Sequence, residues 1–399
     1  MNSEFNTFKL SEVANIIAGG DKPKIFNVNK SDLNNIPVFA NAEKNRGLLG
    51  YTNNPRIDEP AVTIAARGSN VGFVAIRKEP FFPVVRLLTL IPNKEKLDVD
   101  YLFYNLEQNR QNGTGSGQPQ ITIPDISDRV ISLPSLLTQQ KVAKVLSSLD
   151  TKIELNNHIN SELEAMAKTL YDYWFVQFDF PDASGKPYKI AGGKMIYNPV
   201  LKRKIPDGWE DSTIGGIEPN IITGKTPSKN NPEYFGGNVP FITIGDIRGN
   251  TYIVSTKETL TDKGAATQKN KFLPEDSICV TCIASPGLVG FVTTQAQTNQ
   301  QINSLVCDNE SNKYYLYFTI KSYFDGAKAK TGNTFANMNK SDFSSISILK
   351  PSNQVLQLYH QKAHPLFQQI KLKSLENQQL IQIRDWLLPM LMNGQVTIK

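Results

Sequence analysis

At 399 residues, the chain is long enough to fold into two or three domains, each with its own hydrophobic core. Apolar residues make up 40% and charged residues 20% of the sequence, which is typical of an ordered soluble protein and excludes a largely disordered one. No apolar run approaches the roughly 18 residues of a membrane span, no secretory signal opens the chain, and only three cysteines occur, so we expect a cytoplasmic protein without a disulfide framework.

The formal net charge of +6 is spread thinly along the chain. In residues 1–135 and again in 206–352, Lys and Arg nearly balance Asp and Glu. A basic nucleic-acid module usually shows a stronger local excess. Charge alone therefore neither requires nor excludes DNA as a partner.

Residues 1–135 predict a globular domain built mainly from strands. The runs PAVTIAARG (60–68), VGFVAI (71–76) and VVRLLTLIP (84–92) are apolar, rich in β-branched residues and separated by Gly, Asn and Pro, which is typical of buried strands. YLFYNLEQN (101–109) favours a short helix.

Residues 136–179 predict one long helix, because apolar residues recur at alternating spacings of three and four. Pro134 stands just before it, where proline suits a helix start. The segment 180–205 that follows is rich in Gly, Pro and Lys, and we interpret it as a linker.

The chain then repeats itself. ISLPS (131–135) returns as ILKPS (348–352), 217 positions later, and IPVF (36–39) is answered by VPFI (239–242). Residues 206–352 therefore predict a second globular domain, with YYLYFTIKSYF (314–324) as its short helix. Residues 353–396, after Pro351, predict a second long helix.

The two long helices carry seams of the coiled-coil kind. Polar residues within such a seam cost stability but fix register and partner orientation. The alternative is that each helix packs only on its own domain, but a seam of this length that occurs twice favours mutual pairing. The seam residues are Leu149, Ile153, Asn156, Asn160 and Leu163 in the first helix, and Leu366, Ile370, Lys373, Asn377 and Leu380 in the second.

Three short motifs resemble catalytic or metal sites, and each is incomplete. Asn231-Pro232-Glu233-Tyr234 is one residue away from the Asn-Pro-Pro-Tyr signature of enzymes that methylate base amino groups, but Glu233 breaks it and no glycine-rich cofactor loop accompanies it. Cys279 and Cys282 lie in a probable strand and lack a second pair, so we expect buried small residues there. His360 and His364 have a zinc-protease spacing, but Gln361 replaces the general base, and surface positions are favoured. We expect no metal and no catalytic residue.

Four segments resemble a known family. LPSLLTQQKVAKVLSSLDTKIELNNHINSELEAMAKTLYDYWFVQFD (133–179) closely resembles the conserved spacer of specificity subunits of type I restriction–modification systems. IPDGWE (205–210) and ITGKTPSKNNPEYFGGNVPFITIGDI (222–247) resemble the opening of their second recognition domain, and IRDWLLPMLMNGQV (383–396) looks like their C-terminal ending. The first half departs from the pattern, because it begins NSEFNTFKL without the Pro-x-Gly-Trp motif that opens the second half.

The resemblance implies an α+β fold in which two target-recognition domains, in pseudo-twofold repeat, are joined by two long antiparallel coiled-coil helices. It assigns residues 1–135 and 206–352 to the domains and 136–179 and 353–396 to the spacer helices. Each domain would read one half of a bipartite DNA site, and the helices would set the spacing of the halves. Methylation would belong to separate modification subunits that bind S-adenosylmethionine, and cleavage to a restriction subunit that uses ATP, so this chain would be non-catalytic and without a cofactor.

Polar turns in both domains supply side chains suited to phosphate and base contacts. For any one of them, simple solvation is the alternative. Further turns of this kind contain Gln268 and the pair Gln300-Gln301. The candidates are Lys22, Lys24, Asn41, Lys44, Asn45, Arg46, Arg67, Ser69, Asn70, Thr114, Ser116 and Gln118 in the first domain, and Lys225, Thr226, Lys229, Asn230, Tyr234, Asp246, Arg248, Asn250, Lys269, Lys271, Thr331, Asn333 and Asn337 in the second.

Aromatic residues gather at the ends of the long helices, namely Tyr173, Trp174, Phe175 and Trp386. Large aromatic side chains anchor interfaces, so they are candidates for docking two modification subunits, with core capping as the alternative. Two rival functions remain: a DNA methyltransferase with its own target domain, and a coiled-coil scaffold with no DNA role.

Overall fold

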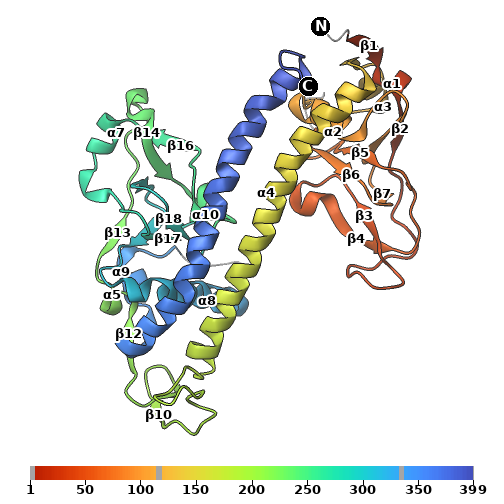
Figure 1. Ribbon diagram of the computed structural model, residues 1–399. Helices are drawn as coiled ribbons and strands as arrows, with labels where there is room; N and C mark the ends of the chain where they lie inside the picture. The colour runs from red at the N-terminus through yellow and green to blue at the C-terminus, as the bar shows by residue number, and fades with distance from the viewer. Residues whose placement is uncertain (1–4, 114–118, 332–336, 399) are drawn as a thin grey trace. The chain divides into compact units, whose positions relative to one another are not determined.

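The computed structural model describes residues 5–113, 119–331 and 337–398, and it divides the chain into two compact units. Unit 1 comprises Met1–Lys152 and Leu380–Lys399, and unit 2 comprises Ile153–Gln379. Both units combine helices and sheets, as predicted (Figure 1). Each unit takes one part of each of the two long helices.

Unit 1 is built on a four-stranded antiparallel sheet with the order β2-β8-β5-β6. A three-stranded sheet, β4-β3-β7, and a two-stranded pair, β1-β9, complete it. The bounds are β1 Asn6–Lys9, β2 Ala14–Ala18, β3 Ile36–Phe39, β4 Leu48–Thr52, β5 Ala61–Ile64, β6 Val74–Arg77, β7 Phe82–Pro83, β8 Leu88–Pro92, β9 Val130–Leu133, α1 Leu10–Val13, η1 Lys44–Gly47, α2 Val99–Gln108 and α3 Ile123–Ser127.

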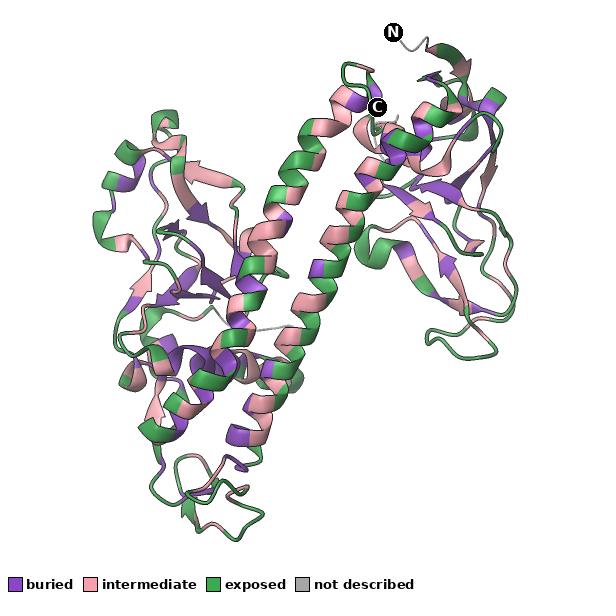
Figure 2. Cartoon of the chain, in the orientation of Figure 1, coloured by how far each residue is buried: buried purple, intermediate pink, exposed green. Residues whose placement is uncertain are grey.

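The core of unit 1 lies between this sheet and its helices. All four residues of β5 are buried, as expected for a central strand of β-branched residues between two neighbours (Figure 2). Helix α2 begins where the Asp98 carboxylate accepts a hydrogen bond from the backbone N–H of Tyr101, and Tyr101 and Leu102 are fully buried against the sheet. Burial of each such side chain stabilises the fold by roughly 2 kcal/mol.

Unit 2 repeats the same topology. Its main sheet has the order β13-β20-β17-β18-β15, its second sheet β16-β14-β19, and its two-stranded pairs are β12-β21 and β10-β11. The bounds are β10 Met195–Asn198, β11 Arg203–Pro206, β12 Glu210–Thr213, β13 Ile221–Thr223, β14 Phe235–Ile242, β15 Tyr252–Ile253, β16 Glu258–Leu260, β17 Ile278–Thr281, β18 Val289–Val292, β19 Gln297–Thr298, β20 Ile302–Leu305, β21 Ser347–Lys350, α5 Ile214–Ile217, η3 Pro232–Tyr234, α6 Ile244–Ile247, α7 Asp262–Ala266, η4 Lys269–Lys271, η5 Glu310–Asn312, α8 Lys313–Thr331 and α9 Lys340–Ser344.

The repeat extends to strand register. In unit 1, β3 pairs in parallel with β7 through Val38 and Phe82. In unit 2, β14 pairs in parallel with β19 through Phe241 and Gln297, and Phe241 is the residue that the sequence repeat aligns with Val38. The internal repeat predicted from short sequence matches is therefore confirmed, and the strand β15 is an addition of unit 2.

The long helices are α4, Leu136–Tyr171, which continues into the π-helical turn η2, Asp172–Val176, and α10, Asn353–Met392. Within unit 2 the two run in opposite directions, because Asn156 bonds to Asn377 while Asn160 bonds to Ser374. The amide of Asn156 donates to Asn377 Oδ1 at 2.8 Å, and Asn377 in turn donates to Asn157 at 2.8 Å. Within unit 1, Arg384 of α10 pairs with Asp150 of α4 at 2.8 Å.

The aromatic cluster after α4 lies in the core of unit 2. Trp174 and Phe175 are only 5% and 2% exposed, and Phe175 packs against Trp209, Tyr315 and Tyr359. The docking role predicted for Trp174 and Phe175 is therefore wrong, because a buried ring offers no surface to a partner. Tyr173 is half-buried, and Trp386 is 62% exposed.

The segment 180–205, interpreted from its composition as a linker, is folded. Phe180 stacks between Tyr188 and Trp209, with ring centroids 4.7 and 4.9 Å away, and Ile205 is fully buried. Strands β10 and β11 pair as a hairpin in the same region. The interpretation as a linker is wrong because these few apolar residues fix a segment that is otherwise rich in Gly, Pro and Lys.

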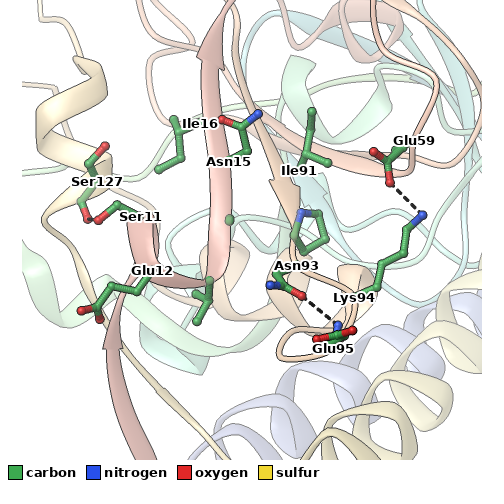
Figure 3. A pocket seen from close by; sticks show the side chains of 13 residues that line it. Ser11, Glu12, Asn15, Ile16, Glu59, Ile91, Asn93, Lys94, Glu95 and Ser127 are labelled. Carbon is green, nitrogen blue, oxygen red and sulfur yellow. Dashed lines mark hydrogen bonds and ion pairs between the residues drawn. The ribbon is translucent and has the colours of Figure 1, made fainter.

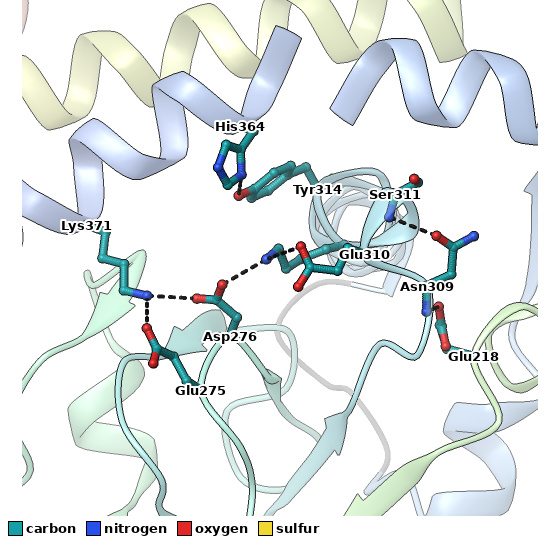
Figure 4. A network of polar contacts seen from close by, with 10 residues as sticks. Glu218, Glu275, Asp276, Asn309, Glu310, Ser311, Tyr314, His364 and Lys371 are labelled. Carbon is teal, nitrogen blue, oxygen red and sulfur yellow. Dashed lines mark hydrogen bonds and ion pairs between the residues drawn. The ribbon is translucent and has the colours of Figure 1, made fainter. Parts of the chain in front are cut away.

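A buried polar network anchors α8 in unit 2 (Figure 4). Lys313, whose side chain is 3% exposed, donates to Asp276 at 2.8 Å, and Lys371 of α10 donates to the same carboxylate at 3.1 Å. The buried Glu218 carboxylate accepts hydrogen bonds from the backbone N–H groups of Asp308 and Asn309 just before α8. The network pairs Lys313 with a carboxylate and satisfies Glu218 with N–H donors, which is the condition for tolerating buried charge.

Candidate DNA interface

Several loops of unit 1 meet at one end of its main sheet. The backbone N–H of Gly19, just after β2, donates to Leu87, just before β8, at 2.8 Å. The Asn41 side chain accepts from the N–H of Ala66 at 2.9 Å and donates to the carbonyl of Val85 at 2.6 Å. These contacts join the loops 19–24, 40–47, 65–70 and 84–87, which we call the loop end of unit 1.

The loop end of unit 1 is rich in exposed cations. Arg56 belongs to it as well, because its guanidinium lies against Gly20. Two acids, Asp21 and Glu43, occur in the same loops. The exposed basic residues are Lys22, Lys24, Lys44, Arg46, Arg56, Arg67 and Arg86. An excess of exposed cations is the electrostatic requirement for contact with phosphates.

The opposite end of the same sheet carries more acids. An open depression of about 860 Å³ lies beside the start of β2 and the end of β8 (Figure 3). Glu12, Glu59 and Glu95 line it, and Lys94 pairs with Glu59 at 2.7 Å. Because phosphates are repelled by carboxylates, the loop end is the end of this sheet suited to DNA.

Unit 2 has an equivalent loop end. The N–H of Gly224 donates to Ile302 at 3.1 Å, which matches the bond from Gly19 to Leu87 in unit 1. The Thr226 hydroxyl donates to Gln300 Oε1 at 2.6 Å, and Arg248 donates to the Ser285 hydroxyl at 3.3 Å. The candidates Lys225, Thr226 and Arg248 therefore lie in loops joined at one end of the sheet.

A glycine is required at the same point of both loop ends. A Cβ atom at Gly19 would lie 2.8 Å from the backbone of Pro83, and one at Gly224 would lie 2.2 Å from the carbonyl oxygen of Asn299. Real Cβ atoms do not approach backbone so closely, so the chain passes these points only as glycine.

Some candidate side chains are already engaged within the protein. Asp246 caps α6 by accepting from the N–H and hydroxyl of Thr243, and its second oxygen accepts from the N–H of Lys257. Both side-chain groups of Asn41 bond to backbone, and Asn250 donates to the carbonyl of Asp246. Because these groups hold loops in place, their contribution to an interface is to position other residues.

Other candidates remain exposed. Lys22 lies over the ring of Phe26 at 3.4 Å, Lys229 pairs loosely with Glu258 at 3.6 Å, and Tyr234 is half-buried in η3. The exposed candidates also include Lys24, Lys44, Asn45, Arg67, Ser69, Lys225, Asn230, Lys269 and Asn337, while Asn70 and Lys271 are partly covered. Thr114, Ser116, Gln118 and Asn333 lie outside the described residues, as does the side chain of Thr331.

Sequence reasoning missed three residues of the loop end, namely Arg56, Val85 and Arg86. The run VVRLLTLIP (84–92) was predicted as one strand, but β8 begins only at Leu88. Val85 and Arg86 instead adopt positive φ angles of 54° and 58°, which β-branched residues rarely do. Because apolar residues flank Arg86 on both sides and no Gly, Pro or Asn occurs at 84–87, the sequence gives no signal for such a turn.

Residues of the three incomplete motifs make contacts within the protein. The Glu233 carboxylate pairs with Lys263 at 2.8 Å. Cys279 and Cys282 are buried, as predicted, and burial raises the pKa of Cys279 to about 12 and that of Cys282 to about 11. In the described ranges, no three His, Cys, Asp or Glu side chains gather as metal ligands.

His360 and His364 differ from their prediction. Both are half-buried rather than on the surface, because the ring of His360 stacks on Tyr314 and that of His364 stacks on His360, with the Tyr314 hydroxyl 3.0 Å from His364 Nδ1. Burial and the neighbouring His364 lower the pKa of His360. In the parts of the chain that the structure describes, no helix is both long and apolar enough to cross a membrane.

These features define a class of protein with two similar mixed domains and two long helices. The family described as "Type I restriction modification DNA specificity domain" matches residues 2–165 and 206–384, so the chain belongs to this family of DNA specificity subunits.

Individual relatives agree. The chain is 33% identical to the type I restriction enzyme HindI specificity subunit of Haemophilus influenzae over 330 residues, covering 70% of this chain and 71% of that one. It is 27% identical to the MjaIX specificity subunit of Methanocaldococcus jannaschii, over 82% of this chain and 76% of that one. The crystal structure of the S subunit of a type I system from M. genitalium matches 98% of this chain and 96% of its own, with a TM-score of 0.63 at 16% identity, which supports the fold.

Proposed function

We propose that this chain directs a type I restriction–modification complex to a bipartite DNA site, with each globular domain reading one half of it. The observation that carries the proposal is the recurrence of one loop end in both halves of the chain. In each loop end, a glycine (Gly19 or Gly224) lies against the start of a turn. Its backbone N–H donates to the carbonyl of the last residue of that turn. Two similar readers in one chain fit a site of two halves.

The long helices α4 and α10 act as an antiparallel coiled coil that sets the gap between the half-sites. Hydrogen bonds from Asn156 to Asn377 and from Asn160 to Ser374 support this role. Polar pairs inside a helical seam fix which residues face each other, at a cost in stability. The register in which α4 and α10 pair therefore determines the gap between the two half-sites.

The chain acts without a cofactor of its own. Methyl transfer from S-adenosylmethionine belongs to modification subunits, two of which dock on this chain, and ATP-driven cleavage belongs to restriction subunits. Trp386, 62% exposed near the end of α10, is the remaining aromatic candidate for docking, with Tyr173 as a half-buried second. Exposed tryptophan is a frequent anchor of protein interfaces.

Mapping of methylated bases tests this function. In cells that carry the chain and its modification partner, methylation should appear at one motif of two short halves separated by a fixed gap. The purified chain alone should transfer no methyl group to DNA. Methyl transfer by the chain alone, or a single undivided motif, would contradict the proposal.

Replacing Arg67 with alanine should weaken DNA binding and reduce its dependence on salt. Arg67 is exposed at the loop end, so it is placed to neutralise one phosphate. Removing one such contact should lower the slope of log K against log salt concentration by about one. Titration of the complex with DNA at several salt concentrations measures this slope. The control is Lys96→Ala, which removes an exposed charge at the opposite end of the sheet. An equal change in slope for both variants would count against the loop end as the interface.

A further inference from the structure

A four-residue turn recurs at the loop end of each unit. Val84–Leu87 precedes β8 in unit 1, and Asn299–Ile302 leads into β20 in unit 2. The last residue of each turn donates its N–H to the carbonyl of the first, at 3.1 Å in unit 1 and 3.3 Å in unit 2. The first residue of each turn donates to the end of the neighbouring strand, Phe39 of β3 or Ile242 of β14. The two turns therefore occupy equivalent places, although their sequences, VVRL and NQQI, are unlike and only the middle residues of the unit 1 turn have positive φ angles.

In unit 1 the middle of this turn is strained and exposed. Val85 and Arg86 both adopt left-handed φ angles, and Val85 is 59% exposed. The N–H groups of these two residues donate to the carbonyls of Gly20 and Gly19 at 2.9 and 3.1 Å, and Asn41 donates to the Val85 carbonyl. Such backbone strain costs on the order of 1–3 kcal/mol per residue and is typically retained where it serves function.

The turn leaves the Arg86 side chain free to contact a partner. Among the described residues, no hydrogen bond or ion pair engages its guanidinium, whereas Arg77, nearby in the same unit, is buried and donates to Thr63. A guanidinium presented in this way bonds in a bidentate manner to O6 and N7 of guanine, and an exposed valine suits the methyl group of thymine.

In unit 2 the exposed side chain of the turn is Gln300, which occupies the position of Val85, one residue before the position of Arg86. The Thr226 hydroxyl donates to its Oε1 at 2.6 Å, which orients the amide while its NH2 group and the second lone pair of Oε1 remain. The neighbouring Gln301 is held within the protein, because its carbonyl accepts from Cys282 and its side chain from Asn299. A glutamine amide forms a bidentate contact with N6 and N7 of adenine.

We propose that the two equivalent turns carry base-reading side chains, with Arg86 selecting a guanine in one half-site and Gln300 selecting an adenine in the other. This assignment rests on the proposed function, in which each unit reads one half-site. Thr226 is then a positioning residue for Gln300, and the exposed cations around Arg86, such as Arg56 and Arg67, supply phosphate contacts.

Methylation mapping of the full chain with its modification partner tests the assignment. Arg86→Gln should reduce the preference for guanine at one position of one half-site by about tenfold and leave the other half-site and the gap unchanged. Gln300→Arg should change one position of the other half-site. The matched control is Lys96→Gln, which removes one exposed charge at the opposite end of the same sheet and should leave every position unchanged.

If the complex with Arg86→Gln methylates no DNA, the variant Arg86→Lys tests the assignment instead. Lysine keeps the charge but makes a single bond to guanine, so this variant should retain the motif with a weaker preference at the same position. Melting temperatures of the purified Arg86 variants should equal that of the wild type, because no hydrogen bond or ion pair of the described residues is lost. The assignment is overturned if Arg86→Gln, or Arg86→Lys where Arg86→Gln is inactive, leaves the base preference unchanged at every position. In that case the bipartite motif of the wild type still supports the proposed function. A wild-type motif without two halves overturns both.

Discussion

Lengthening both long helices by one heptad should widen the gap between the two DNA half-sites by about three base pairs. Seven residues extend a helix by roughly 10 Å at 1.5 Å per residue, and one base pair rises about 3.4 Å. The insertions belong between Asn160 and Ser161 in α4 and between Lys373 and Ser374 in α10, because Asn160 and Ser374 face each other. A full heptad in each helix keeps the seam in phase, so the half-site sequences should not change.

Methylation mapping measures this effect directly. The control is a seven-residue insertion between Gly192 and Gly193, in the exposed loop before β10, which leaves both helices intact and should not alter the gap. A gap that stays the same in the helix variant would show that α4 and α10 do not set the spacing. A change in either half-site would assign base recognition to the helices.

Replacing Asp276 with alanine should destabilise the fold by about 3–5 kcal/mol, because it leaves the buried ammonium of Lys313 without its main partner. The same change removes one of the two carboxylates paired with Lys371. Urea unfolding of the purified chain measures the loss. Asp308→Ala removes an exposed carboxylate beside the same helix and should change the free energy of unfolding little.

The stability lost on replacing Asp276 with alanine should also depend on pH. Burial tends to raise the pKa of Asp276, but its bonds and attraction to Lys313 and Lys371 outweigh burial, so its pKa lies below the usual value. Its contribution to stability is then complete above the unfolded-state pKa, near 4, and is lost as pH falls through the lower folded-state value. The difference in unfolding free energy between wild type and Asp276→Ala should therefore shrink at low pH. A difference that is constant with pH would show that the effect is not electrostatic.

The sequence predicted the repeat and the starts of the long helices because both depend on local patterns. ISLPS and ILKPS mark β9 and β21, and Pro134 and Pro351 precede α4 and α10. Tertiary contacts decided the rest. Trp174 and Phe175 are as aromatic as any docking surface, and only the packing of Tyr315 and Tyr359 around them shows that they are core.

The candidate interface was predictable as a set of loops and less so residue by residue. Polar turns identified Lys225 and Arg67, which lie at the loop ends, because turn residues are exposed wherever the turn falls. Asp246 and Asn41 have the same polarity, yet their partners are backbone groups that the sequence does not reveal. Arg86 was hidden by the apolar residues on both sides of it.

The close passage of the chain at Gly19 and Gly224 has a consequence for how new DNA targets arise. The fixed parts of the unit 1 turn are glycine, main-chain bonds and the Asn41 amide, and the side chain of residue 86 makes no hydrogen bond or ion pair among the described residues. Under the proposed assignment, a single-codon change at residue 86 would alter the target of one domain with little loss of stability and without altering the other domain. In the proposed complex, modification and restriction subunits share this one reader. Such a change would then redirect both activities together, and the host genome would be protected at the same sites that become subject to cleavage.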